Sequence, residues 1–226
     1  MTVLHLADET EAADLAAFLS RLLHYDRGAA VRLQAAGTAL AVFGRPPSFE
    51  VLAIRAVRLA KPYEDGLDVT LDTTVSAGEF LELVDERAAT AGVPGAVTGP
   101  PWAGLLPPRT GWRPEPGLPA RDALRATVAA AVAEFRSRTE ELAPEARTRS
   151  ELDRIGRDIW SRRIEDTGLP VRAVHAAQSL GFLRPGGGAD DTGLFSSGAW
   201  LRLRTPYGSV AVRRAGPLGA LGVSVR

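Results

Sequence analysis

The sequence predicts an α+β protein: an N-terminal antiparallel β-meander flanked by helices, then a C-terminal domain of three helices and a β-hairpin, arranged like a winged helix. Two observations lead to this prediction. Apolar residues recur at helical spacing in some segments and alternate with polar residues in others. Between two such patterned regions, residues 92–119 are rich in proline and glycine, which prevents regular structure.

The first patterned region begins with a helix and continues with strands. Asp8 and Glu11 have the spacing of a capping box, and a helical stripe of apolar residues follows to about Tyr25. Four strands are expected after it, at 29–35, 38–44, 49–60 and 67–75. The third strand is apolar on both faces, which places it inside the sheet, and the fourth alternates between apolar and polar residues.

A second helix is expected directly after the strands. Ser76 and Glu79 form another capping box, and Val75 is placed to pack against Phe80. The helical pattern ends near Gly92, just before Pro94. Residues 1–92 are therefore the first predicted domain, an α+β meander domain.

Residues 93–118 are predicted to be a connector rich in proline, glycine and tryptophan. Its two tryptophans, Trp102 and Trp112, are expected to pack onto a neighbouring surface. The alternative is an extended polyproline-like ligand for an aromatic groove on another protein, although no repeated motif supports it.

The second domain is predicted at 119–226. Three helices are expected at 119–142, 148–165 and 170–181, the second of them starting at a Thr148/Glu151 capping box. Two strands at 199–204 and 209–214 then form a hairpin through Thr205-Pro206-Tyr207-Gly208.

The closing residues resemble a known group of proteins. Ala176–Leu183, followed by Trp200–Leu203 and Thr205–Val210, are similar to uncharacterised actinobacterial proteins built from two adjoining domains of unknown function. The strand passage from Val31 to Arg58 is similar to the first of those domains. The resemblance implies a two-domain protein, and it carries over no activity and no functional residue.

No motif for catalysis, a cofactor or a metal ion occurs in the sequence. Ser196 and Ser197 lack the first glycine of a nucleophile elbow, and Gly186–Gly188 leads into two acids rather than Lys-Ser/Thr. The three histidines all lie outside supporting motifs: His5, His24 and His175. We therefore expect a non-enzymatic protein with no catalytic, cofactor-binding or metal-binding residues.

Composition indicates where the protein works. Apolar residues make up 45% and charged residues 24%, as in globular proteins, and cysteine is absent, which fits a reducing compartment. No apolar run approaches the ~20 residues that cross a bilayer, and no secretory signal opens the chain. We expect a cytoplasmic protein without membrane contact.

Charge divides unevenly between the two predicted parts. Residues 1–118 contain 10 basic and 15 acidic groups, whereas residues 119–226 contain 17 and 12. Only Lys61 among the basic residues is lysine and asparagine is absent, which indicates GC-rich codons rather than selection for guanidinium chemistry. The basic part could contact phosphates, or the two parts could attract one another, or two copies could pack head to tail.

Three functional hypotheses remain, and one of them, an enzyme with an unfamiliar site, would need a pocket that holds His24 or His175 beside a buried carboxylate. The leading one is a binding or regulatory protein that contacts a protein partner, or a second copy of itself, through four aromatic residues: Trp102, Trp112, Trp200 and Tyr207. The alternative is a winged-helix-like DNA-binding protein that uses six polar residues: Arg172, Gln178, Arg202, Arg204, Arg213 and Arg214. Against the alternative, helix 170–181 offers few side chains that can read base edges.

Overall fold

The structure is a computed structural model that describes residues 2–60, 71–184 and 192–214. Helices and antiparallel strands both occur, which confirms the predicted α+β class. The N-terminal half contains β1 (Val3–His5), α1 (Glu9–Tyr25), β2 (Ala30–Ala36), β3 (Ala39–Gly44), the 3-10 helix η1 (Pro47–Phe49), β4 (Leu52–Arg58), β5 (Asp72–Ser76), α2 (Ala77–Glu82), β6 (Val84–Asp85) and β7 (Thr90–Gly92).

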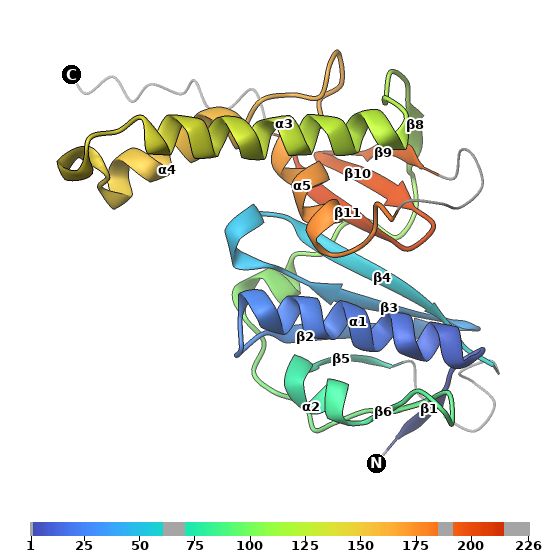
Figure 1. Cartoon of the computed structure of the whole chain (residues 1–226). Helices are drawn as coiled ribbons and strands as arrows, with labels where there is room; N and C mark the ends of the chain where they lie inside the picture. The colour runs from blue at the N-terminus through green and yellow to red at the C-terminus, as the bar shows by residue number, and fades with distance from the viewer. Residues whose placement is uncertain (1, 61–70, 185–191, 215–226) are drawn as a thin grey trace, which may run out of the picture.

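The connecting segment, residues 93–112, contains one 3-10 helix, η2 (Pro101–Gly104). The C-terminal half follows, with β8 (Arg113–Glu115), α3 (Arg121–Glu140), the 3-10 helix η3 (Pro144–Ala146), α4 (Arg149–Trp160), α5 (Val171–Ser179), β9 (Gly193–Ser197), β10 (Trp200–Thr205) and β11 (Gly208–Arg213). In Figure 1, α3 extends past the strands and α4 lies under its far end.

One antiparallel sheet runs through both halves. Its eight described strands have the order β5-β2-β3-β4-β11-β10-β9-β8. The halves join where β4 pairs with β11, residues 52–54 against 209–211. A separate three-stranded sheet, β1-β7-β6, lies beside α2 at the N-terminal end of the molecule.

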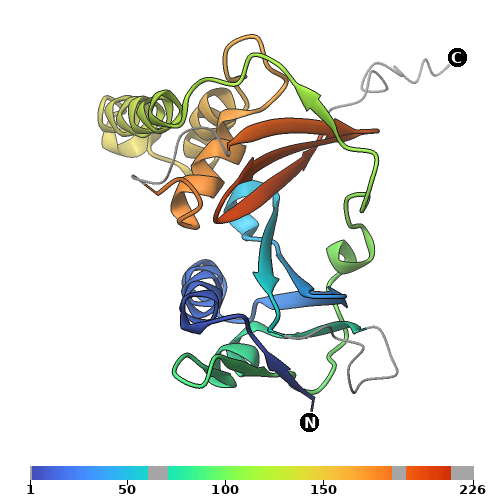
Figure 2. The same ribbon diagram turned by 90° about the vertical axis from the view of Figure 1, so that its right-hand side faces the viewer.

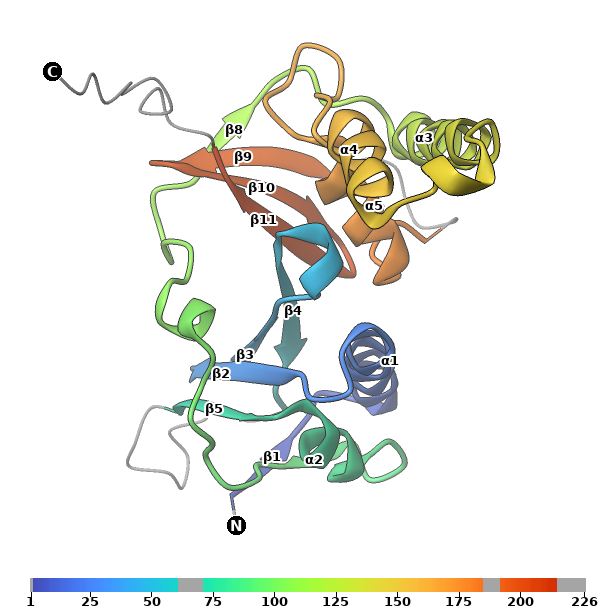
Figure 3. The ribbon, with the colours of Figure 1, turned by 90° about the vertical axis from the view of Figure 1, so that its left-hand side faces the viewer.

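The two faces of the main sheet are covered differently. The helices pack on one face, and the connecting segment runs along the other, which we call the outer face (Figures 2 and 3). Alternation along β10 follows from this arrangement: Leu201 and Leu203 are buried in the core under the helices, whereas Trp200 packs on the outer face. A smaller apolar cluster on the outer face contains Phe43, Leu52, Ile54 and Ala211, with Trp102 and Trp200 against it.

Three helix starts are confirmed at the predicted capping residues. The side chains of Asp8, Ser76 and Thr148 accept from the backbone N–H three residues on, at 2.9, 3.3 and 3.3 Å. Each cap satisfies an N–H that the first helical turn leaves without an intrahelical partner.

The predicted length of the second helix is wrong. The helix ends at Glu82 rather than near Gly92, because residues 83–92 turn back as β6 and β7. The Asp85 carboxylate accepts from Ala88 N at 2.9 Å within this turn, and β7 pairs with β1. Pairing with a strand about ninety residues away overrides a pattern that is helical locally.

The predicted strands of the meander need smaller corrections. Those at 29–35 and 38–44 are confirmed within a residue, but 49–60 is shortened to β4 because residues 47–49 form η1. Of the predicted strand 67–75, residues 67–70 lie outside the described residues. Thr74 faces outward but is buried, because the connecting segment covers it and Val97 N donates to its carbonyl at 2.9 Å.

The C-terminal hairpin is confirmed as β10 and β11, within a larger arrangement than predicted. β9 pairs with the other side of β10 and β4 pairs with the other side of β11, so both hairpin strands lie inside the sheet. β8 and β9 were not predicted. The winged-helix arrangement itself stays a prediction.

Contacts between the halves are both apolar and ionic. Phe18 on α1 stacks on Phe182 beyond α5, with ring centroids 5.7 Å apart. Arg184 pairs with Asp14 of α1 at 2.8 Å, and Arg172 lies 3.8 Å from Glu50. The attraction between oppositely charged parts, which the sequence left open, is present in these ion pairs.

Candidate binding pocket between the two halves

A pocket of about 380 Å³ lies where β4 begins, β11 ends and η2 crosses the outer face. We call it the junction pocket. Leu52 and Ala211, which are buried and paired across β4 and β11, line it on the sheet side. The pocket therefore depends on both halves and on the connecting segment.

Two tryptophans line the junction pocket. Trp102 comes from η2 and is held against the outer-face cluster, and Trp200 projects from the start of β10. Both side chains are only partly buried, so each contributes apolar surface to the pocket. Leu105 extends this surface and is 54% exposed.

The charged residues of the pocket are mostly basic. Arg45, Arg172 and Arg213 line it together with a single acid, Glu50. The Arg213 guanidinium carbon lies 5.7 Å from the centroid of the Trp200 ring, in cation–π range. The lining therefore carries a formal excess of two positive charges, held beside two aromatic faces.

Arg172 and Glu50 interact without a hydrogen bond. The 3.8 Å between Arg172 Nε and Glu50 Oε2 is too long for one, and Nε is buried with no other hydrogen-bond partner. Glu50 itself has a φ of +51°, in the left-handed region that non-glycine residues rarely occupy. Glu50 directly follows η1, and a left-handed residue is a common end for a helical turn.

The structure brings four of the sequence-predicted residues into this pocket: Trp102, Trp200, Arg172 and Arg213. Sequence reasoning missed Arg45 and Glu50, which lie in the connection between β3 and β4. The only signal there was the Pro46-Pro47 break between two strands, and it does not indicate which charged residues will converge.

The remaining predicted residues lie elsewhere. Arg202 lies over the Trp112 ring at 5.6 Å and Arg204 over Phe195 at 5.3 Å, both on the outer face. Arg214 pairs with Glu115 of β8. Gln178 is on α5, and its Oε1 is buried without a hydrogen-bond partner. Tyr207 belongs to the contact between the halves, since its carbonyl accepts from Arg55 and Arg184 lies over its ring.

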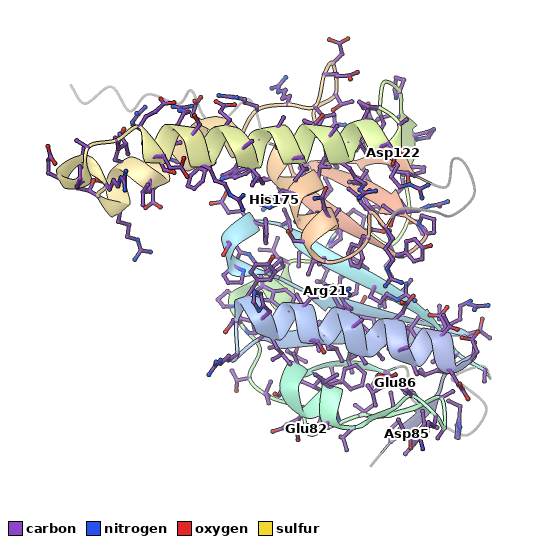
Figure 4. All side chains as sticks on the ribbon, viewed as in Figure 1. Arg21, Glu82, Asp85, Glu86, Asp122 and His175 are labelled. Carbon is purple, nitrogen blue, oxygen red and sulfur yellow. The ribbon has the colours of Figure 1, made fainter. Side chains whose placement is uncertain are left out.

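His175 is the histidine most strongly affected by its surroundings. It lies on α5 (Figure 4), and its ring contacts those of Trp160 and Phe49, at 4.7 and 5.1 Å between ring centroids. Burial lowers the pKa of His175, so the ring is neutral at pH 7. Within the described residues, no three His, Cys, Asp or Glu side chains are grouped as they would be around a metal ion.

Together, these features define a two-part α+β chain with a pocket at the junction of its parts. Residues 1–104 match the family model of a domain of unknown function (DUF8010), and residues 107–217 match a second domain of unknown function (DUF8185). The chain is thus built from these two adjoining domains, as the resemblance implied. No curated protein matches the chain. Across the described ranges, no helix is both long and apolar enough to span a membrane.

Proposed function

We propose that this protein is a non-enzymatic, cytoplasmic binding protein that holds an acidic segment of a protein partner in the junction pocket. One observation carries the proposal: two partly exposed tryptophans and three arginines, contributed by both halves and the connecting segment, line the same pocket.

Both side-chain types suit this role. Tryptophan and arginine dominate the binding energy of protein interfaces, because each buries a large area and keeps a polar group for orientation. A carboxylate that enters beside Arg213 or Arg172 can accept two parallel hydrogen bonds from one guanidinium. An apolar side chain of the same segment can then pack on Trp102 and Leu105.

The alternative of DNA binding has less support from the position of the hairpin. A winged helix uses the ends of its hairpin and one helix against a duplex, but here both hairpin strands have sheet neighbours. Arg204 and Arg213 lie over aromatic rings of the same sheet, and Arg214 pairs with Glu115. A pocket of about 380 Å³ fits individual side chains better than a duplex.

The test uses a fluorescein-labelled peptide of alternating glutamate and phenylalanine, and its lysine counterpart, with fluorescence anisotropy as the readout. We expect the full chain to bind the acidic peptide and Arg213→Glu to weaken that binding by about tenfold or more, because a charged pair becomes repulsive. Trp102→Ala should weaken it as well. Arg149→Glu on α4 is the matched control, since its side chain is 96% exposed and lies outside the pocket.

Three results would overturn the proposal. They are equal binding of the acidic and basic peptides, an Arg149→Glu effect as large as that of Arg213→Glu, and preferential binding of a short DNA duplex that weakens steeply with added salt. Urea unfolding of each variant separates a lost contact from a lost fold.

A further inference from the structure

A second pocket, of about 220 Å³, lies on the outer face over the N-terminal strands and shares no lining residue with the junction pocket. We call it the outer-face pocket. Its sheet side is lined by Gln34 and by small side chains of β2, β3 and β4: Ala36, Ala39, Ala41 and Ala56. Phe43 and Ile54 give it a larger apolar wall, and Pro107 to Arg109 of the connecting segment line its other side.

The charged side chain of β10 that lines this pocket, Arg202, is incompletely paired. Its Nη2 donates to Ser209 Oγ at 3.0 Å, and its guanidinium carbon lies 5.6 Å from the Trp112 ring centroid. Its Nε is buried with no hydrogen-bond partner, and no carboxylate of the described residues forms an ion pair with it. A guanidinium withdrawn from water in this way is a costly group to leave without an anion.

The electrostatic surroundings agree with this geometry. Burial lowers the pKa of Arg202, and the neighbouring charge of Arg204 lowers it further. An arginine side chain nevertheless stays protonated in proteins, so the pocket contains a full positive charge. Arg109 adds a second cation to the lining, and none of the acidic residues that the structure describes lines the pocket.

We infer that the outer-face pocket binds a small monocarboxylate with a short apolar tail, its carboxylate on Arg202 and its tail against Phe43 and Ile54 over the alanines. Arg202 lines the pocket, and its guanidinium fork matches a carboxylate. The apolar lining favours a hydrocarbon tail over a second charged group. The volume is below the range of roughly 300–1,000 Å³ that drug-sized ligands occupy, so the tail is limited to a few carbons.

Hexanoate is the probe, with hexanol and hexylamine as neutral and cationic molecules of the same chain length. Isothermal titration calorimetry on the full chain should detect binding of hexanoate but not of hexanol or hexylamine. Arg202→Gln should weaken that binding by about tenfold or more, because a charge-assisted pair becomes neutral. Arg202→Lys should restore only part of it, since an ammonium keeps the charge without the fork.

Two further variants separate the effect of the Arg202 charge from the effect of the volume available to the hydrocarbon tail. Ala41→Leu keeps Arg202 and fills the tail region, so it should also weaken hexanoate binding by about tenfold. Arg213→Gln, in the junction pocket, should leave it within about twofold of the parent. Equal binding of hexanol, or unchanged affinity in both Arg202→Gln and Ala41→Leu, would overturn the inference. Because the acidic-peptide test depends on Arg213, either proposal can fail while the other stands.

Discussion

The residue whose chemistry responds most directly to its surroundings is His175. Trp160 and Phe49 exclude water from its ring, and the resulting burial lowers the pKa of the imidazole from its ordinary 6.5. In the unfolded chain the pKa returns to that ordinary value. As pH falls, the unfolded state therefore binds the proton first, and folding stability decreases.

This linkage predicts a pH window. The stability contribution of neutral His175 is complete above about pH 7, and it is lost as pH falls through 6.5 towards the lower folded pKa. Urea midpoints between about pH 7.5 and 5.5 should fall, and His175→Phe should reduce that fall. His5→Gln, at an exposed position, should keep it. The same pH dependence in His175→Phe as in the parent would contradict the prediction.

The role of a single residue can be predicted from the sequence when its hydrogen-bond partner lies a few residues away in the chain. Asp8, Ser76 and Thr148 could be identified as caps because the groups that they bind lie three residues away. Arg45 and Glu50 could not be assigned to a pocket with Trp200. Arg45 and Glu50 belong to the N-terminal half and Trp200 to the C-terminal half, and no local sequence pattern indicates that these residues lie close together in the fold.

Among the structural elements, the β10–β11 hairpin has a turn whose conformation is constrained by the Phe182 ring that packs against it. Gly208 begins β11 with a φ of +157°, and a Cβ added there would lie 2.5 Å from Cε1 of the Phe182 ring. Phe182 is itself buried and stacked on Phe18, so its ring cannot shift to relieve this clash.

We therefore expect Gly208→Ala to lower the free energy of unfolding by about 1–3 kcal/mol through overpacking. Gly95→Ala is the control, because a Cβ there meets nothing within 4 Å. Its effect should stay within about 0.5 kcal/mol. Urea denaturation measures both, and equal effects would show that the Phe182 contact does not constrain the turn.

Element prediction succeeded for the strands of six or seven residues and failed for most of the shorter ones. β2 and β3 follow one another and pair, so alternation and Gly37 were enough to place them. β6 and β7 pair with each other and β7 also pairs with the distant β1, while β8 pairs with β9 across more than seventy residues. Such short strands have too little internal pattern to compete with a helical one.

In the whole molecule, the paired strands β4 and β11 join the two family domains in one sheet. Arg55 lies beside this joint with a side chain that is 6% exposed. Its guanidinium contacts Glu11 at 2.8 Å and Asp14 at 3.3 Å, and it donates to the Tyr207 carbonyl at 2.8 Å. One side chain from the N-terminal half thus neutralises two acids of α1 and holds the C-terminal hairpin.

This arrangement predicts that the halves unfold together. Far-UV circular dichroism, which reports all elements, and tryptophan fluorescence, to which Trp160 and Trp200 contribute from the C-terminal half, should give coincident urea transitions. Arg55→Met should lower the free energy of unfolding by about 1–3 kcal/mol and move both transitions equally, because Glu11 and Asp14 then keep only the more exposed Arg58 and Arg184, and the Tyr207 carbonyl loses this donor.

Arg58→Met is the matched control. Arg58 also contacts Glu11 at 2.8 Å, but its side chain is 69% exposed, so water can replace it and the loss should stay below about 1 kcal/mol. Transitions that separate in the parent protein, with fluorescence and circular dichroism reporting different midpoints, would mean that the three residue pairs between β4 and β11 do not couple the halves. The junction pocket would then open and close with the independent motion of two domains. If the transitions coincide, the pocket is as permanent as the fold, because Trp200 and Arg213 belong to the sheet that joins the halves and Trp102 packs against it.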